Sequence, residues 1–178
     1  AGDTANKTVS VAIANDSIVE LTETFTASLA INTATTDPGA RSVSVGDTGT
    51  GTITDNDTAT FTIDDVAVNE VDGTLDFTLS LDNPLDIAVD VDVSFADVST
   101  GPGDTTHATH TINFAARDTA HKTISVAIAN DSIVELTETF TASLAINTAT
   151  THPGARSVSV GDTATGPLTH HDTATFKL

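Results

Sequence analysis

The chain has 178 residues and a net charge of −19, and it contains no cysteine, methionine, tryptophan or tyrosine. Because acidic side chains so outnumber basic ones, phosphate backbones and anionic membrane surfaces would be repelled, and we expect no nucleic acid partner. No apolar run approaches the roughly 20 residues of a spanning helix, so we expect no membrane insertion, and no disulfide can reinforce the core.

A long internal repeat organises the chain. Residues 1–63 return as residues 116–178, an offset of 115 positions with eleven differences. A period of this length corresponds to one β-sandwich domain and exceeds the length of solenoid repeats. The repeat predicts three parts: the C-terminal half of one unit (1–57), a complete unit (58–172) and the first strand of a further unit (173–178).

Alternation of apolar and polar residues predicts strands along most of the chain, and no stretch shows a helical period. Residues 1–57 repeat the last three strands of a unit. The complete unit then contains seven predicted strands, at 58–68, 74–82, 87–97, 106–115, 121–129, 136–147 and 156–169. Turn residues such as Asn83-Pro84 separate these runs. Seven short strands predict an all-β, immunoglobulin-like β-sandwich, repeated in tandem with a period of 115.

Four apolar rows of the complete unit supply its predicted core. They are Leu75, Phe77, Leu79, Leu81; Val89, Val91, Val93, Phe95; Ile124, Val126, Ile128; and Phe140, Ala142, Leu144, Ile146. The first copy repeats the last two rows as Val9, Val11, Ile13 and Phe25, Ala27, Leu29, Ile31. Because the half unit has no opposing strands of its own, its rows and open edges need a neighbour. We therefore expect head-to-tail self-assembly with neighbouring copies of the repeat.

Acidic residues gather where predicted strands end. The segment Asn-Asp-Ser-Ile-Val-Glu stands at 130–135 and again at 15–20, and Asp55-Asn56-Asp57 closes the first copy. Carboxylates on loops at one end of a sandwich repel each other unless a hard cation joins them. Ca²⁺ takes six to eight oxygens from such flexible loops, so these clusters favour a calcium site.

The order of these motifs resembles the Calx-beta family, the sandwich domain of sodium–calcium exchangers, integrin β4 and many bacterial surface proteins. The matching pieces are Asn69-Glu70-Val71-Asp72-Gly73; Val93-Ser94-Phe95 with Gly101-Pro102-Gly103-Asp104; Ile112-Asn113-Phe114; Asp131, Glu135 and Glu138 in an Asp-x-x-x-Glu-x-x-Glu loop; and Gly51-Thr52-Ile53-Thr54-Asp55-Asn56-Asp57. The ordered set covers essentially the whole chain.

The resemblance implies bound Ca²⁺ between the loops at one end of each unit. In the complete unit it implies the ligands Glu70, Asp104, Asp131, Glu135 and Asp172. In the half unit (1–57) it implies the ligands Asp16, Glu20, Asp55, Asn56 and Asp57. The half unit has no counterparts of Glu70 and Asp104, because both residues precede 116–178, the segment that repeats residues 1–63.

Histidines replace two of the implied ligands in the complete unit. His170 and His171 stand where the first copy has Asp55 and Asn56, and imidazole is a poor ligand for Ca²⁺. One interpretation is a Zn²⁺ or Ni²⁺ site, and the other is sequence drift without function. Adjacent strand residues point to opposite faces, so one metal ion could rarely bind both side chains.

No catalytic motif is present, neither Gly-x-Ser-x-Gly nor His-Glu-x-x-His nor a P-loop, so we expect no enzyme. The sequence favours a structural or adhesive module, extracellular or at the cell surface. It would bind Ca²⁺ at domain ends and extend or assemble a surface fibre or filament. Two alternatives stay open: a ligand-binding adhesin module, whose target the sequence does not identify, and a Ca²⁺-sensing regulatory domain.

Overall fold

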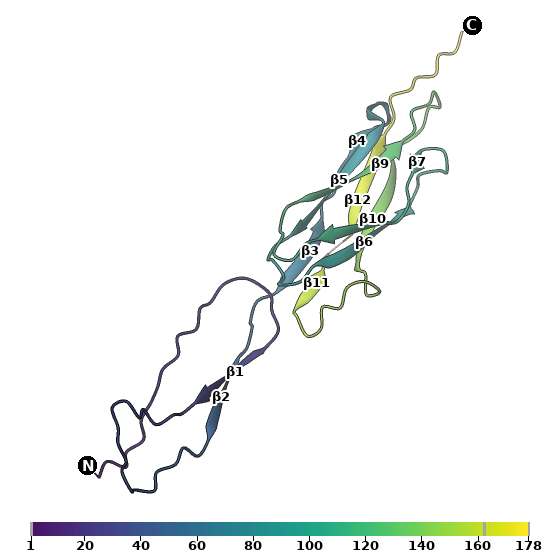
Figure 1. The fold of residues 1–178 in the computed structure, drawn as a ribbon. Coiled ribbons are helices and arrows are strands. Elements are labelled where there is room, and N and C mark those ends of the chain that lie inside the picture. Colours follow the sequence, from purple (N-terminus) through teal and green to yellow (C-terminus); the bar gives the residue numbers. More distant parts are fainter. Residues whose placement is uncertain (1, 162, 178) are drawn as a thin grey trace.

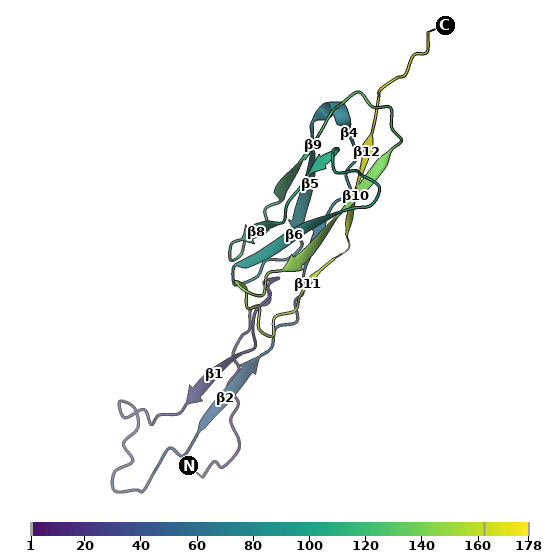
Figure 2. The same ribbon diagram turned by 90° about the vertical axis from the view of Figure 1, so that its right-hand side faces the viewer.

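Two packed β-sheets, whose strands are mostly antiparallel, form the larger part of the molecule. A separate two-stranded antiparallel sheet precedes them (Figures 1 and 2). The structure, a computed structural model, describes residues 2–161 and 163–177. In this small sheet, β1 (Glu23–Ser28) pairs with β2 (Thr48–Ile53). Among the described residues, no helix has the length and apolar character needed to span a membrane.

The sandwich contains ten strands in two five-stranded sheets. They are β3 (Ala59–Ile63), β4 (Val68–Asn69), β5 (Thr74–Leu81), β6 (Val89–Asp97), β7 (Thr105–Thr106), β8 (His110–Phe114), β9 (Lys122–Ile128), β10 (Glu138–Ile146), β11 (Val158–Val160) and β12 (Ala164–Thr169). One sheet has the order β4-β12-β10-β6-β8 and the other β11-β3-β5-β9-β7. A short 3-10 helix, η1 (Glu70–Asp72), follows β4. The predicted all-β, immunoglobulin-like sandwich is confirmed.

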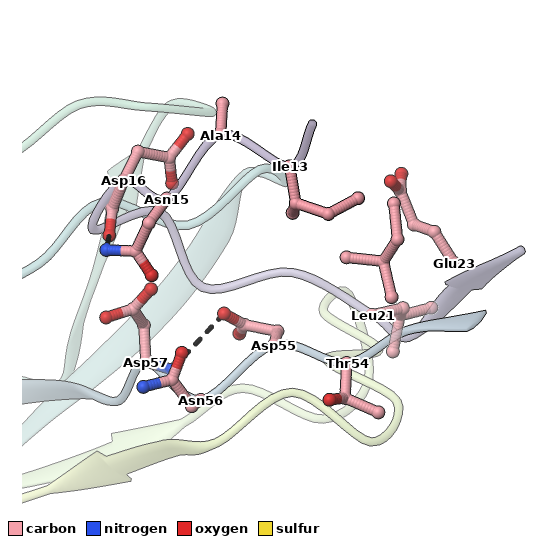
Figure 3. A pocket seen from close by; sticks show the side chains of 11 residues that line it. Ile13, Ala14, Asn15, Asp16, Leu21, Glu23, Thr54, Asp55, Asn56 and Asp57 are labelled. Atoms are coloured by element: carbon pink, nitrogen blue, oxygen red, sulfur yellow. Dashed lines mark hydrogen bonds between the residues drawn. The ribbon is translucent and has the colours of Figure 1, made fainter. Parts of the chain in front are cut away.

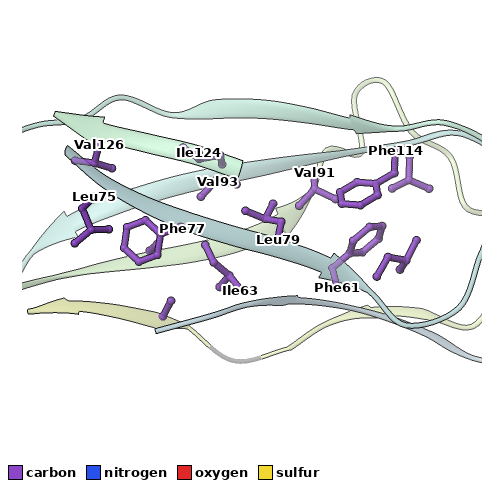
Figure 4. Packing of buried hydrophobic residues seen from close by; sticks show 14 of the residues in the cluster. Phe61, Ile63, Leu75, Phe77, Leu79, Val91, Val93, Phe114, Ile124 and Val126 are labelled. Carbon is purple, nitrogen blue, oxygen red and sulfur yellow. The ribbon is translucent and has the colours of Figure 1, made fainter. Parts of the chain in front are cut away.

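The predicted apolar rows meet between the two sheets, as Figure 4 shows for part of the cluster. Phe77 packs edge-on against Phe140 from the opposite sheet, with ring centroids 5.8 Å apart. Gly166 lies opposite Phe140 on β12, and a Cβ there would come within 2.9 Å of that ring. Burial of each such large apolar side chain contributes about 1.5–3 kcal/mol, so this cluster is the main source of the sandwich's stability.

Three predicted strands are each divided between the two sheets, which corrects the seven-strand prediction. Residues 58–68 form β3 in one sheet and β4 in the other, 106–115 contributes to β7 and β8, and 156–169 contains β11 and β12. Asp64 and Asp65 make the first crossing, and the Asp65 carboxylate accepts the Thr165 N–H at 2.6 Å. Chains pass between packed sheets through such bends at the edges of a sandwich.

The half unit departs from its prediction in one strand. The segments around residues 25 and 50 pair as β1 and β2, in the same register as β10 with β12. Residues 7–13, the counterpart of β9, form no strand, and Val9 is 85% exposed. The physical reason is that β9 pairs with β5 and β7, and the half unit contains no equivalent of either.

Residues 173–177 also form no strand, although they repeat the start of the complete unit. Phe176 is 95% exposed, whereas its counterpart Phe61 in β3 is fully buried beside Phe114. Residue 178 lies outside the described residues. The division of the chain at 57 and 172 stays a prediction from the repeat.

The loops that connect the strands gather at two opposite ends of the sandwich. The inner pole carries the loops 82–88, 115–121 and 147–157 and faces the half unit (Figure 1). The outer pole carries η1, the loops 98–104 and 129–137, and residues 170–172 beyond β12. The C-terminal segment leaves from this outer pole (Figure 2).

Candidate metal centre

Glu70 is a buried carboxylate at the outer pole, and the local fold sets its position. Asn69 caps η1: its side chain accepts the Val71 N–H, and the Asp72 carboxylate accepts the Asn69 N–H. Gly73 ends η1 with a φ of 75°, a left-handed conformation that glycine adopts without strain. Because β4 pairs in parallel with β12, Glu70 lies beside the residues that follow β12.

Three of the predicted ligands come together at this pole. One carboxylate oxygen from each of Glu70, Asp131 and Asp172 lies within 4.8 Å of the other two. Asp131 lies in the loop after β9, where its Oδ1 accepts the Ile133 N–H at 2.6 Å. Residues more than 30 positions apart thus present oxygen atoms to one point, as a Ca²⁺ site requires.

The protonation of this cluster reflects the crowding of negative charge. Burial by itself raises the pKa of Glu70, but hydrogen bonds from His170, the His171 N–H and Asp172 hold that pKa below its ordinary value. The pKa of Asp172 is raised by its hydrogen bond with Glu70 and then by burial. A cation bound here would lower the pKa of both carboxyl groups, because it favours their charged forms.

His170 occupies the middle of the acidic cluster. Its Nδ1 lies 3.0 Å from Glu70 Oε2 and 3.4 Å from Glu135 Oε2, and its side chain is only 2% exposed. Burial lowers the pKa of His170, but the hydrogen bond and charge of Glu70 and the charges of neighbouring glutamates raise it above its ordinary value. When protonated, His170 would supply positive charge in this unit, where the first copy has Asp55.

Glu138 and Asp104 extend the cluster on its other side. Glu138, the first residue of β10, has its Oε2 3.9 Å from His170 Nε2. Burial raises the pKa of Glu138, and the adjacent Asp104 carboxylate raises it further. The Asp104 carboxylate also accepts the Gly101 N–H, which holds the 98–104 loop at this pole. Glu138 was outside the predicted ligand set, although the Asp-x-x-x-Glu-x-x-Glu spacing contains it.

The carboxylate oxygens of this cluster are suitable ligands for a hard cation, whereas the His170 nitrogen is not. Among the described side chains, three buried polar atoms have no hydrogen-bond partner, and all three lie in this cluster: Glu138 Oε2, Asp172 Oδ2 and His170 Nε2. A buried carboxylate oxygen without a partner is costly in free energy, and an added cation would satisfy it. The two oxygens suit Ca²⁺, whereas the imidazole nitrogen does not.

The two adjacent histidines, which follow the end of β12, point to different places. His170 faces the carboxylates, whereas the His171 side chain lies beside the Asn69 side chain and is exposed. A single ion bound by both side chains is incompatible with this arrangement. The Zn²⁺ or Ni²⁺ interpretation of the pair therefore loses its geometric basis.

The equivalent acidic residues of the half unit line a pocket at its end (Figure 3). Asp16, Asp55, Asn56 and Asp57 all line this pocket, and the figure shows Glu23 at its far side. Asp55 is a structural acceptor: Oδ2 accepts the Glu20 N–H at 2.9 Å and Oδ1 accepts the Asp57 N–H at 3.2 Å. These hydrogen bonds lower the pKa of Asp55.

Glu20 is the predicted ligand of the half unit that lies apart from the pocket lining. Its Oε1 is 3.7 Å from Arg117 Nη2, in the inner pole of the sandwich. Burial raises the pKa of Glu20, and the nearby Asp16 charge raises it further. The acidic end of the half unit therefore meets the sandwich directly, and the two units share charged groups there.

The chain was compared with known families and structures. The sequence pattern of the Calx-beta domain family matches residues 1–59 and 52–165. No curated protein is significantly similar to the chain in sequence. The apo-form Calx CBD1 domain has a similar structure, with a TM-score of 0.55 at 13% identity; the match covers 65% of this chain and 100% of that one.

Two further solved structures are similar at 13% identity. CBD12 from CALX1.2 has a TM-score of 0.54, covering 64% of this chain and 46% of that chain. The calcium binding domain CBD12 of CALX1.1 has a TM-score of 0.50, covering 63% and 44%. The chain thus spans less than half of these two proteins. At such identities the likeness concerns the fold alone.

Proposed function

The chain belongs to the Calx-beta domain family, and from this premise we propose that it is a Ca²⁺-binding repeat module with a structural role. The observation that carries the proposal is the outer pole, where three carboxylates converge and buried oxygens lack partners. Glu70, Asp131 and Asp172 would hold the ion, with Glu135, Glu138 and Asp104 within reach of the same loops. Bound Ca²⁺ would supply the positive charge that these carboxylates lack.

The mechanical consequence follows from electrostatics. Without a cation, the carboxylates of the loops repel each other and the pole is loosened; with a cation, the loops become cross-linked. The half unit places its own acidic loops against the inner pole of the sandwich, through Glu20 and Arg117. A cation bound by Asp16, Asp55, Asn56 and Asp57 would therefore stiffen the junction between the two units.

We extend the proposal to an extracellular or cell-surface setting, without catalytic activity, in a fibre or filament. Exposed apolar residues of the half unit support assembly, because Val9, Val11 and Leu29 stay largely in solvent. Strands of another copy of the repeat would cover them, as β5 and β6 cover the corresponding rows of the sandwich. Light scattering tests this step, since a strictly monomeric chain would contradict it.

A Ca²⁺-sensing regulatory domain is the second candidate. The shared charges at the junction favour it, because an ion bound near Glu20 would change the contact with Arg117. Small-angle scattering with and without Ca²⁺ separates the two roles. A regulatory domain should change the angle between its units, whereas a spacer should only lose flexibility. An adhesin module would require a ligand site on one unit, and no further observation favours it.

Calorimetric titration with Ca²⁺, and with Mg²⁺ as control, tests the proposal directly. A ligand that binds only the folded state stabilises it by about 2.7 kcal/mol at 100 times its Kd. Ca²⁺ should therefore raise the melting temperature of the sandwich, and Asp131→Ala with Glu135→Ala should remove the part of the rise that the outer pole contributes. Asp37→Ala with Asp47→Ala, which removes two exposed acids elsewhere, should leave it intact. Equal melting curves in Ca²⁺ and in chelator would overturn the metal site.

A further inference from the structure

The junction between the half unit and the sandwich is a specific docking contact. Val19 is 0% exposed and forms a parallel bridge with Leu85 of the inner pole. Its N–H donates to Pro84 O at 2.9 Å, and its carbonyl accepts the Asp86 N–H at 3.3 Å. The loop of the half unit thus joins the inner pole by a buried side chain and two backbone hydrogen bonds.

The inner pole is built to hold that loop. The Arg117 N–H donates to Leu85 O at 2.7 Å, and the Arg117 guanidinium lies near Glu20. Arg156 forms a two-point hydrogen bond with the Asp86 carboxylate, with Nη2 at 2.7 Å from Oδ2. Leu21 passes over Gly154, where a Cβ would lie 3.6 Å from Leu21 Cδ2. Apolar contact and opposite charge therefore coincide on this surface.

The same loop occurs a second time without a partner. Residues 131–136 repeat 16–21 with identical sequence, Asp-Ser-Ile-Val-Glu-Leu. Here Ile133, Val134 and Leu136 are 58%, 53% and 85% exposed. Their loop, residues 129–137, lies at the outer pole beside the C-terminal segment, which repeats the start of the sandwich unit (Figure 2). Three apolar side chains of this one loop therefore stay in solvent, whereas the identical loop of the half unit is docked.

We propose that residues 131–136 are a docking surface for the inner pole of a further unit of this same repeat. Val134 would occupy the position against that unit's Leu85 that Val19 occupies in the present chain. Glu135 would face its Arg117, and Leu136 would pass over its Gly154. A second copy of the present chain does not fit this role, because its inner pole is already covered by its own residues 16–21.

The proposal deepens the repeat-array function, and it does not require bound metal. Its test therefore uses chelator throughout, so that failure of calcium binding cannot be mistaken for failure of docking. The chain has no cysteine, so a single Val134→Cys substitution gives a unique thiol for a maleimide probe. A matched chain carries the same substitution and a second copy of residues 58–172 appended after Asp172.

In the present chain, Val134→Cys should react rapidly and Val19→Cys slowly. In the extended chain, Val134→Cys should become protected, with a labelling rate at least about tenfold lower. Val11→Cys, exposed in both chains, controls for the probe. Arg117→Glu in the appended copy, at an exposed side chain, should raise the rate again. An unchanged Val134→Cys rate on extension, or rapid labelling of Val19→Cys, would overturn the proposal.

Discussion

The two copies of the loop Asp-Ser-Ile-Val-Glu-Leu have one sequence and two environments. In the half unit the loop is docked, and Val19 is buried with its backbone bonded on both sides. At the outer pole the loop is uncovered, and Val134 is half exposed. Local preference is equal in the two copies, so the neighbouring unit alone decides whether the valine becomes part of a core.

The preceding segment gives the same result more strongly. Residues 122–128 form β9 with Ile124, Val126 and Ile128 buried, whereas residues 7–13, which differ at one position, form no strand. A strand needs a hydrogen-bonding partner on at least one edge. The comparison teaches that the alternating pattern specifies which face is apolar, and that the partner strands decide whether the segment forms a strand.

The largest expected difference concerns the two equivalent phenylalanines of β10 and β1. Phe140→Ala should lower the free energy of unfolding of the sandwich by about 3–5 kcal/mol, because it opens a cavity in a closed core. Phe25→Ala should cost well under half as much, since the Phe25 ring is only partly buried. Urea unfolding followed by circular dichroism measures both. Equal losses would show that the half unit has a core of its own.

The next difference concerns the docked and the free valine. Val19→Ala should weaken the junction by about 1.5 kcal/mol, because it removes two buried carbon atoms. Val134→Ala should change stability by no more than about 0.5 kcal/mol, as expected for an exposed position. Hydrogen exchange of the Val19 and Asp86 amides, which are bonded across the junction, reports the opening. Unaltered protection in Val19→Ala would mean that the contact contributes little.

A third pair of variants exchanges the acidic ends of the two copies. Because His170 and His171 replace oxygen ligands, His170→Asp with His171→Asn should tighten Ca²⁺ binding at the outer pole, by roughly tenfold or 1.4 kcal/mol. The same variant should melt earlier in chelator, since a further carboxylate then joins the cluster and replaces a histidine. Asp55→His with Asn56→His should weaken the half unit's site. A revertant that binds no better would contradict the assignment of these positions as ligands.

The smallest expected effect is a pH dependence at the inner pole. Hydrogen bonds from Arg156 lower the pKa of Asp86 below its ordinary value. Since the folded pKa is depressed, this contribution is present above the unfolded pKa and is lost as pH falls through the folded pKa. Asp86→Asn should therefore cost about 1 kcal/mol or less near neutral pH and nothing in acid. A loss that persists at low pH would indicate a packing effect.

Much of the sandwich could be predicted from alternation alone. The strands at 74–82, 87–97, 121–129 and 136–147 are confirmed within two residues at each end, and their apolar rows meet in one core. The sheet crossings were missed, because alternation does not report which sheet a strand joins. One signal was available in the sequence. The apolar residues stand at odd positions before Asp64-Asp65 (Phe61, Ile63) and at even positions after it (Val66, Val68).

The sequence predicted most residues of the candidate site, but it did not predict that His170 lies in the middle of them. Motif order placed Glu70, Asp131 and Asp172 together, and the structure brings their oxygens within 4.8 Å. The central position of His170 and the closeness of Glu138 depend on side-chain directions after β12 and at the start of β10. Those directions follow from how three loops converge, which no single segment encodes.

The sequence by itself determined the strand pattern, the strongly acidic loops and the fact that two units carry the same loop. Only the tertiary structure decided which copy of each segment forms a strand and which copy is buried. The physical reason is that strand pairing, burial and charge repulsion are properties of neighbours. Residues 7–13 have no partner strands in the half unit, and no inner pole of another unit covers Val134. His170 is surrounded by carboxylates that come from distant parts of the chain.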